Sequence, residues 1–138
     1  MKRGLVVLAL CALPVQGLAQ SPAPDPIAQN LFPPELVMKH GGEIGLDEQQ
    51  RASMKDMIQK AQARFLDVQW DMQAESEKLI RLLQARPVDE TATIAQADKV
   101  LGLEREVKKA QLSLLVRIKN LLTAPQQAKL LELRKRSD

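Results

Sequence analysis

The sequence is poor in the side chains from which most catalytic sites are built. Its 138 residues include one cysteine, one histidine and no tyrosine, and only Phe32, Phe65 and Trp70 are aromatic. One histidine and one cysteine cannot supply a Ser/His/Asp or Cys/His set. A glycine-rich phosphate loop and an H-E-x-x-H motif are also missing from the sequence. We therefore expect no enzymatic activity.

The first 19 residues have the composition of an export signal. Lys2 and Arg3 form a charged start, residues 4–15 are largely apolar, and small side chains precede a cleavage point that we expect after Ala19. The apolar run is shorter than the roughly 20 residues that a membrane span requires. Cys11 lies inside this leader, so the mature chain has no thiol. The sequence predicts a periplasmic protein with no transmembrane span after cleavage.

The charge of the mature chain is nearly balanced. Removal of Lys2 and Arg3 from the 20 basic residues leaves 18, against 17 acidic residues. The two signs are interspersed, apart from a short basic end at Arg134–Arg136. Such a surface is typical of solvated helices rather than of a polyanion-binding face. We expect no nucleic-acid partner.

The mature chain divides into a lead-in and one helical domain. Residues 20–31 are polar and proline-spaced, which predicts a lead-in without regular structure. Residues 32–138 are rich in helix-forming side chains and form the predicted domain. A short helix is expected within residues 32–40, because its prolines suit a first helical turn and Gly41-Gly42 ends it.

Two long helices should follow, from about Glu48 to Arg86 and from about Asp89 to Leu121. Pro87 stops the first, and the short connection forces the second to return antiparallel. A last helix is expected from about Ala124 to Arg136. The predicted fold is all-α, a long antiparallel helical hairpin with short N-terminal and C-terminal helices. The predicted seam residues of the two long helices are Met54, Ile58, Ala61, Phe65, Val68, Met72, Leu79 and Leu83, then Val100, Leu103, Val107, Ala110, Leu114, Ile118 and Leu121. The last helix carries Ala128, Leu130, Leu131 and Leu133.

One short motif occurs twice, each time before a helix. It begins at Leu46-Asp47 and ends at Gln50, and it recurs from Leu122-Thr123 to Gln126. Asp47 or Thr123 at the N-cap can accept a hydrogen bond from the backbone three residues on, while the glutamine reaches back to the N-cap. A single capping box is a common helix start and carries no functional content.

The leader, the hairpin and both boxes together resemble the Spy/CpxP family of periplasmic proteins with L-T-x-x-Q motifs, which includes the CnrX/ZraP metal-responsive branch. The resemblance covers about residues 32–136, and Asp47 departs from the usual Thr. It implies a hooked hairpin that forms a homodimer. Chaperone-branch members hold unfolded clients without ATP. Metal-branch members sense or buffer divalent metals and can signal to a partner in the membrane.

His40 is the candidate metal ligand. Metal-branch proteins tend to place histidines in this segment, but one turn earlier this chain has Leu36. Transition-metal sites usually draw on several nitrogen or sulfur ligands. We therefore expect His40 to be a surface residue in a helix-ending turn, and we expect no cofactor, with a divalent transition metal at His40 as the alternative.

Leu66 and Trp70 are candidates for client or dimer contact. Trp70 lies roughly 140° around the helix from Phe65, away from the predicted seam. The second subunit, Phe32 of the folded-back N-terminal segment, or a client could cover it. Our main expectation is an ATP-independent chaperone or envelope-stress adaptor that binds unfolded periplasmic proteins or a membrane-bound sensor partner. The alternative is a heavy-metal sensor or resistance protein of the CnrX/ZraP type, and a structural coiled-coil spacer is a third class.

Overall fold

The computed structural model describes residues 25–136, and its regular structure is entirely helical within that range. The predicted leader, its cleavage point and residues 20–24 of the lead-in lie outside the described residues. The helices are α1 (Pro26–Gln29), α2 (Pro34–Lys39), α3 (Glu48–Gln84), α4 (Glu90–Leu121) and α5 (Ala124–Lys135).

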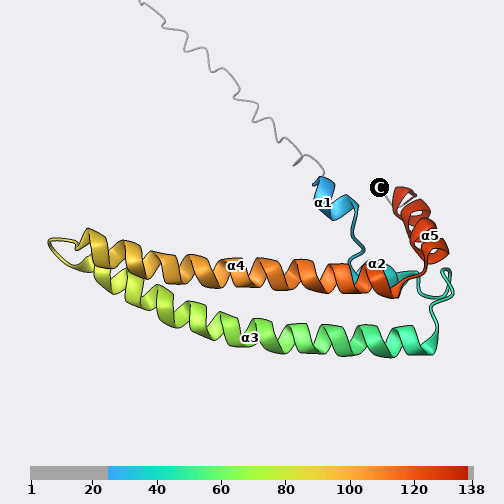
Figure 1. Cartoon of the computed structure of the whole chain (residues 1–138), viewed down its shortest axis with the longest axis horizontal. Coiled ribbons are helices and arrows are strands. Elements are labelled where there is room, and N and C mark those ends of the chain that lie inside the picture. Colours follow the sequence, from blue (N-terminus) through green and yellow to red (C-terminus); the bar gives the residue numbers. More distant parts are fainter. Residues whose placement is uncertain (1–24, 137–138) are drawn as a thin grey trace, which may run out of the picture.

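The two long helices α3 and α4 lie side by side and antiparallel, which confirms the predicted hairpin (Figure 1). With 37 residues, α3 is about 55 Å long. It stops at Gln84, two residues before the predicted end, and its C-cap Ala85 is already extended. Asp89 then caps α4 by accepting a hydrogen bond from the Ala92 N–H at 2.9 Å. A proline two residues after the cap explains the early end of α3, because Pro87 cannot continue a helix.

The hydrophobic core gathers at one end of the hairpin, where α2, the start of α3, the end of α4 and α5 meet. We call this the hook end, and we call the region around the 85–89 connection the turn end. At the hook end Val37, Ile118 and Leu130 are completely buried and Phe32 nearly so. In Figure 1, α5 turns away from the hairpin axis at this end. Four helices therefore share one core at the hook end.

The lead-in is more ordered than the sequence predicted. Pro26–Gln29 forms a helical turn, and Asp25 caps it by accepting from the Ile27 N–H at 2.9 Å. Arg134 of α5 donates to the backbone carbonyls of Gln29, at 2.8 Å, and Leu31. Residues 26–29 of the expected lead-in are therefore helical, and Arg134 of α5 and Lys119 of α4 bind the backbone of residues 29–31.

Of the predicted seam residues in the two long helices, only Leu83 is exposed, and of the apolar residues expected in the last helix, Ala128 and Leu131 are exposed. Leu83 is 54% exposed and Leu131 is 41% exposed, whereas Leu82 is partly buried and Leu130 and Leu133 are buried. The α3 seam steps from Leu79 to Leu82, three residues on. A straight α-helix has 3.6 residues per turn, so a seam that alternates steps of four and three drifts along a long helix.

Candidate functional site

Both capping boxes form as predicted. Asp47 accepts a hydrogen bond from the Gln50 N–H at 2.7 Å, and Gln50 Oε1 accepts from the Asp47 N–H at 3.1 Å. In the second box, Thr123 Oγ1 accepts from the Gln126 N–H at 3.4 Å, and Gln126 Oε1 accepts from the Thr123 N–H at 2.9 Å. The Asp47 carboxylate thus caps α3 in the same way as the Thr123 hydroxyl caps α5. Each box satisfies backbone donors that the first helical turn leaves without partners.

The two glutamines of these boxes also bind each other, although 76 residues separate them. Gln50 Nε2 donates to Gln126 Oε1 at 2.8 Å, and Gln126 Nε2 donates to Gln50 Oε1 at 3.0 Å. The remaining protons go to backbone carbonyls, from Gln50 to Leu121 at 3.0 Å and from Gln126 to Gly45 at 3.2 Å. We call this pair of amides the glutamine clasp. Both side chains are buried, and the clasp joins the starts of α3 and α5 through paired hydrogen bonds.

A glycine-rich loop carries the chain from α2 to the first box. Gly45 has a φ of +67°, a left-handed conformation that favours glycine. The Leu46 N–H donates to the Gly41 carbonyl at 2.8 Å, and Arg51 Nε donates to the Leu46 carbonyl at 3.2 Å. This conformation directs the Gly45 carbonyl toward the clasp. The loop therefore fixes the geometry of the first box.

His40 ends α2, as predicted, but it is not a surface residue. Only 7% of it is exposed, and its Nδ1 lies 2.7 Å from Glu43 Oε1. The hydrogen bond from His40 holds the pKa of the Glu43 carboxyl below its ordinary value, against partial desolvation and with help from Lys129 and Arg136. An ionised Glu43 accepts, so Nδ1 carries the proton and Nε2 keeps its lone pair in the neutral ring. That Nε2 is buried and has no hydrogen-bond partner among the described residues.

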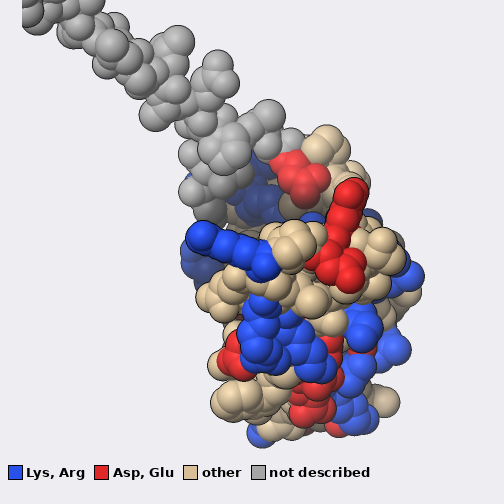
Figure 2. Space-filling model, turned by 90° about the vertical axis from the view of Figure 1, so that its left-hand side faces the viewer, with Lys and Arg blue, Asp and Glu red and all other residues tan. Residues whose placement is uncertain are grey.

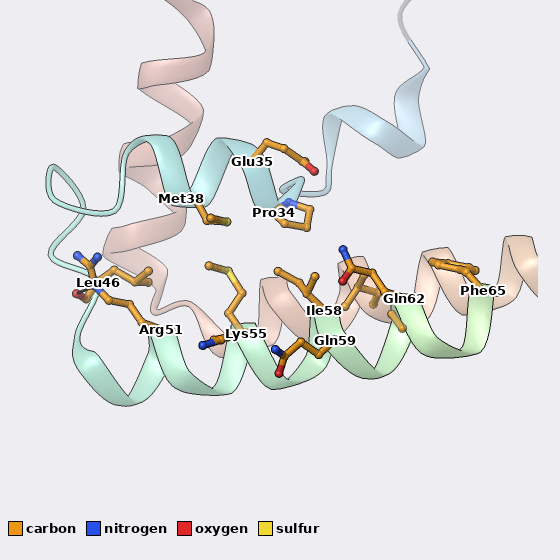
Figure 3. Close-up of a pocket in the computed structure, with 13 residues that line it drawn as sticks. Pro34, Glu35, Met38, Leu46, Arg51, Lys55, Ile58, Gln59, Gln62 and Phe65 are labelled. Atoms are coloured by element: carbon orange, nitrogen blue, oxygen red, sulfur yellow. Dashed lines mark hydrogen bonds between the residues drawn. The ribbon is translucent and has the colours of Figure 1, made fainter. Parts of the chain in front are cut away.

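An open groove of about 740 Å³ lies between α2 and α3, close to this loop (Figure 3). Pro34, Glu35 and Met38 of α2 form one side. Its other side and floor are mostly apolar and come from Leu46, Met54, Ile58, Ala61, Phe65 and Leu114, with Arg51, Lys55, Gln59 and Gln62 completing the lining. The groove is therefore an apolar surface with charged side chains around it, and sequence periodicity alone did not indicate it.

Leu66 and Trp70 point away from the hairpin seam, as the helical angle predicted. They are 54% and 64% exposed. Packing of Trp70 on Phe32 does not occur, because Phe32 is buried at the hook end under the cations of Lys119, 5.9 Å from the ring centre, and Arg134, at 5.4 Å. Trp70 and Leu66 thus leave an apolar pair on the outside of α3.

Charged side chains of both signs are mixed over the end of the molecule drawn in Figure 2. Within residues 25–136, no group of three His, Cys, Asp or Glu side chains is arranged to hold a metal ion. None of the described helices is long and apolar enough to cross a membrane. A single subunit therefore offers His40 Nε2 as one nitrogen donor rather than a complete site.

The comparison with protein families decides the relationship. A family model described as heavy-metal resistance matches residues 4–129. The chain belongs to this family. The heavy-metal resistance family is part of the Spy/CpxP-like superfamily of periplasmic helical proteins, so the resemblance drawn from the two boxes is confirmed at that level. No curated protein and no solved structure gives a significant match to the chain.

Sequence reasoning found the boxes and His40 but missed how they connect. The contact between Gln50 and Gln126 could have been inferred from topology, since an antiparallel hairpin brings the start of α3 beside the end of α4, where the second box lies. The burial of His40 had no sequence signal, because it depends on how the loop of residues 40–47 folds against α5.

Proposed function

We propose that this family member is an exported, metal-responsive protein in which His40 is a transition-metal ligand. The match to the heavy-metal resistance family over residues 4–129 carries the proposal. The geometry of His40 supports it. A histidine ligand commonly donates its second ring N–H to a carboxylate, which fixes the tautomer and raises the basicity of the ligating nitrogen. The His40–Glu43 pair has this form, with Nε2 left as the donor atom.

Because Nε2 is buried, a metal would reach it only if the loop after His40 moved aside, and the remaining ligands would then come from water or from a second subunit. Zinc, nickel, cobalt and copper all accept imidazole nitrogen, so His40 does not select among them. A bound metal ion would take up the Nε2 lone pair, to which no hydrogen-bond donor is directed among the described residues. Since His40 joins α2 to the loop before α3, a metal there would act on the position of α2.

Isothermal titration of the protein with zinc, nickel and copper(II) tests this proposal. We expect binding to weaken at least tenfold in His40→Ala and less in Glu43→Gln, because the glutamine still accepts a hydrogen bond from Nδ1. Lys39→Ala, an exposed residue at the end of α2, is a matched control nearby. Equal affinity in wild type and His40→Ala would contradict the proposal.

We also propose a homodimer through the outer surface of α3. Between Lys55 and Glu77 this surface carries no charge, and its exposed residues are Gln59, Gln62, Leu66, Gln69, Trp70 and Gln73. Depletion of charge around an aromatic residue is typical of an interface core. Lys55 and Glu77 each lie 11 residues from Leu66 on the same side of the helix. A two-fold axis at Leu66 would therefore place Lys55 of one subunit opposite Glu77 of the other, and the two charges would attract. Sedimentation velocity would test this, with Leu66→Glu expected to give a monomer and Ala63→Glu, at a flank of the surface, weakening it less.

A chaperone is the second candidate, because exposed Leu66 and Trp70 and the apolar groove could contact unfolded chains. Light scattering of a chemically unfolded client tests it in the absence of metal. Suppression of aggregation that is lost in Trp70→Ala would favour this candidate. If only added metal produced suppression, and His40→Ala abolished the effect, the two proposals would describe one activity.

A further inference from the structure

Two methionines face the groove from opposite sides. Met38 comes from α2 and is 63% exposed, while Met54 comes from α3 and is 4% exposed. Figure 3 shows Met38 reaching from α2 into the groove toward α3. Hydrophobic packing explains Met54, which belongs to the core. It does not explain why a large apolar side chain such as Met38 remains in solvent at the mouth of the groove.

Thioether sulfur gives this pair a specific chemistry. It is a soft, neutral donor that favours Cu(I) and similar ions over hard divalent cations, and it needs no deprotonation. Methionine is unbranched and has three rotatable bonds, so the exposed Met38 can change rotamer to bring its sulfur to the Met54 side of the groove. The mature chain offers no thiol that would compete for the ion.

The charges around the groove favour an ion of low charge. Arg51 and Lys55 line it together with a single acid, Glu35. The local balance is one positive charge, and the repulsion that an entering cation experiences scales with its own charge. A divalent ion is therefore disfavoured twice as strongly as a monovalent one. Softness and charge both indicate Cu(I) or Ag(I).

We propose that the groove binds one soft monovalent ion, Cu(I) or Ag(I), between the thioether sulfurs of Met38 and Met54. Two sulfur–metal bonds form, no bond of the protein breaks, and no electron or proton is transferred. Because the ligands come from different helices, the bound ion would hold α2 against α3. The inference rests on the proposed role in metal response, but it uses ligands other than His40.

Titration with silver nitrate in a chloride-free buffer tests the site, because Ag(I) has the softness of Cu(I) without its redox chemistry. In protein labelled with ¹³C at the methionine methyl groups, we expect the Met38 and Met54 signals to shift and to saturate at one ion per chain. The Met57 and Met72 signals should stay in place. The thermal midpoint should rise with Ag(I). Met38→Leu should weaken binding at least tenfold, whereas Met57→Leu should leave it unchanged.

Three results would overturn the inference: no methyl shift, parallel shifts of all four signals, or undiminished binding in Met38→Leu. Met38 is exposed, so its leucine variant folds even if Met54→Leu does not. Failure here is distinguishable from failure of the proposed function. A protein whose His40 ring signals respond to zinc or nickel, but whose methionine methyl groups ignore Ag(I), would retain the His40 proposal and lose this one.

Discussion

The two ends of the hairpin differ in how much of their apolar surface they bury. At the hook end, Ile118 and Leu130 are completely buried beneath side chains from several segments. At the turn end only α3 and α4 are present, and Ile80, Leu83 and Ile94 are each more than half exposed. Two helices bury one stripe each and cannot enclose a core, which requires a further layer.

The two ends of the hairpin are suited to different roles. The clasp, His40 and the groove all lie at the hook end, where the surrounding core holds them in position. Beyond Val68, toward the turn, the hairpin is held by packing of α3 against α4 and by a few polar contacts, such as the hydrogen bond from Gln96 to Glu75. Its outward leucine and isoleucine side chains are available to a second copy or a client. We therefore expect stability to come from the hook end and association to use the exposed side chains of the long helices, Leu66 and Trp70 included.

The largest expected effect compares the same substitution at two places on α4. Ile118 is completely buried at the hook end, whereas Ile94 is 57% exposed near the turn. Ile118→Ala should lower the free energy of unfolding by about 2–5 kcal/mol, because it removes buried methyl groups and leaves a cavity. Ile94→Ala should change it by less than about 0.5 kcal/mol. Urea unfolding followed by circular dichroism measures both, and similar values would show that the two ends contribute equally.

The next effect concerns the glutamine clasp. Gln50→Ala or Gln126→Ala leaves the partner amide buried with an unsatisfied group, at about 1–3 kcal/mol in the free energy of unfolding. The double variant should lose less than the sum of the two, since its second substitution removes the orphaned group. Exposed Gln59→Ala on α3 is the control. Strict additivity in the double-mutant cycle would mean that the two glutamines act only as separate caps.

The helices and their caps were predictable because their signals are local. Asp47, Thr123 and Pro87 define helix ends within a few residues of sequence, and the apolar spacing defined the α4 seam correctly. Leu83 was wrong because a seam of 37 residues accumulates angular drift that one repeat pattern does not describe. Errors of this kind grow toward the end of a long helix.

The site was only partly predictable because its parts meet through tertiary packing. His40 is buried by a loop conformation that depends on Gly45 and on α5. The pairing of Gln50 with Gln126 depends on how α5 packs against the start of α3. The hydrogen bonds from Arg134 to the backbone before α2 likewise depend on the position of α5. Each contact joins residues that are distant in sequence, where periodicity and capping rules give no information.

A smaller effect is expected from the polar link at the turn end. Gln96 is 7% exposed and donates from Nε2 to the Glu75 side chain at 2.6 Å and to its backbone carbonyl at 2.9 Å. Gln96→Ala should reduce the free energy of unfolding by about 1 kcal/mol, less than either clasp variant. Gln111→Ala, exposed on the same helix, should have almost no effect. A loss at Gln96 larger than that at Gln50 would reverse the comparison between the two ends.

The smallest effect is on pH dependence, where each end has one perturbed carboxyl. Hydrogen bonds hold the pKa of Glu43 (from His40) and of Glu75 (from Lys78, then Gln96) below the ordinary value. A lowered folded-state pKa stabilises the fold above the unfolded pKa, and this contribution is lost as the pH falls through the folded pKa. Both links should therefore persist at neutral pH and weaken only below about pH 4, since an unperturbed Glu titrates near 4.3.

Carboxyl ¹³C shifts recorded against pH separate the two ends. His40→Ala should return the Glu43 midpoint toward its ordinary value and leave Glu75 unchanged. Gln96→Ala should raise the Glu75 midpoint only partly, because the bond from Lys78 at 2.6 Å remains, and should not affect Glu43. If His40→Ala moved both midpoints, the perturbation would come from a field shared along the hairpin, and the two ends could not be treated as independent.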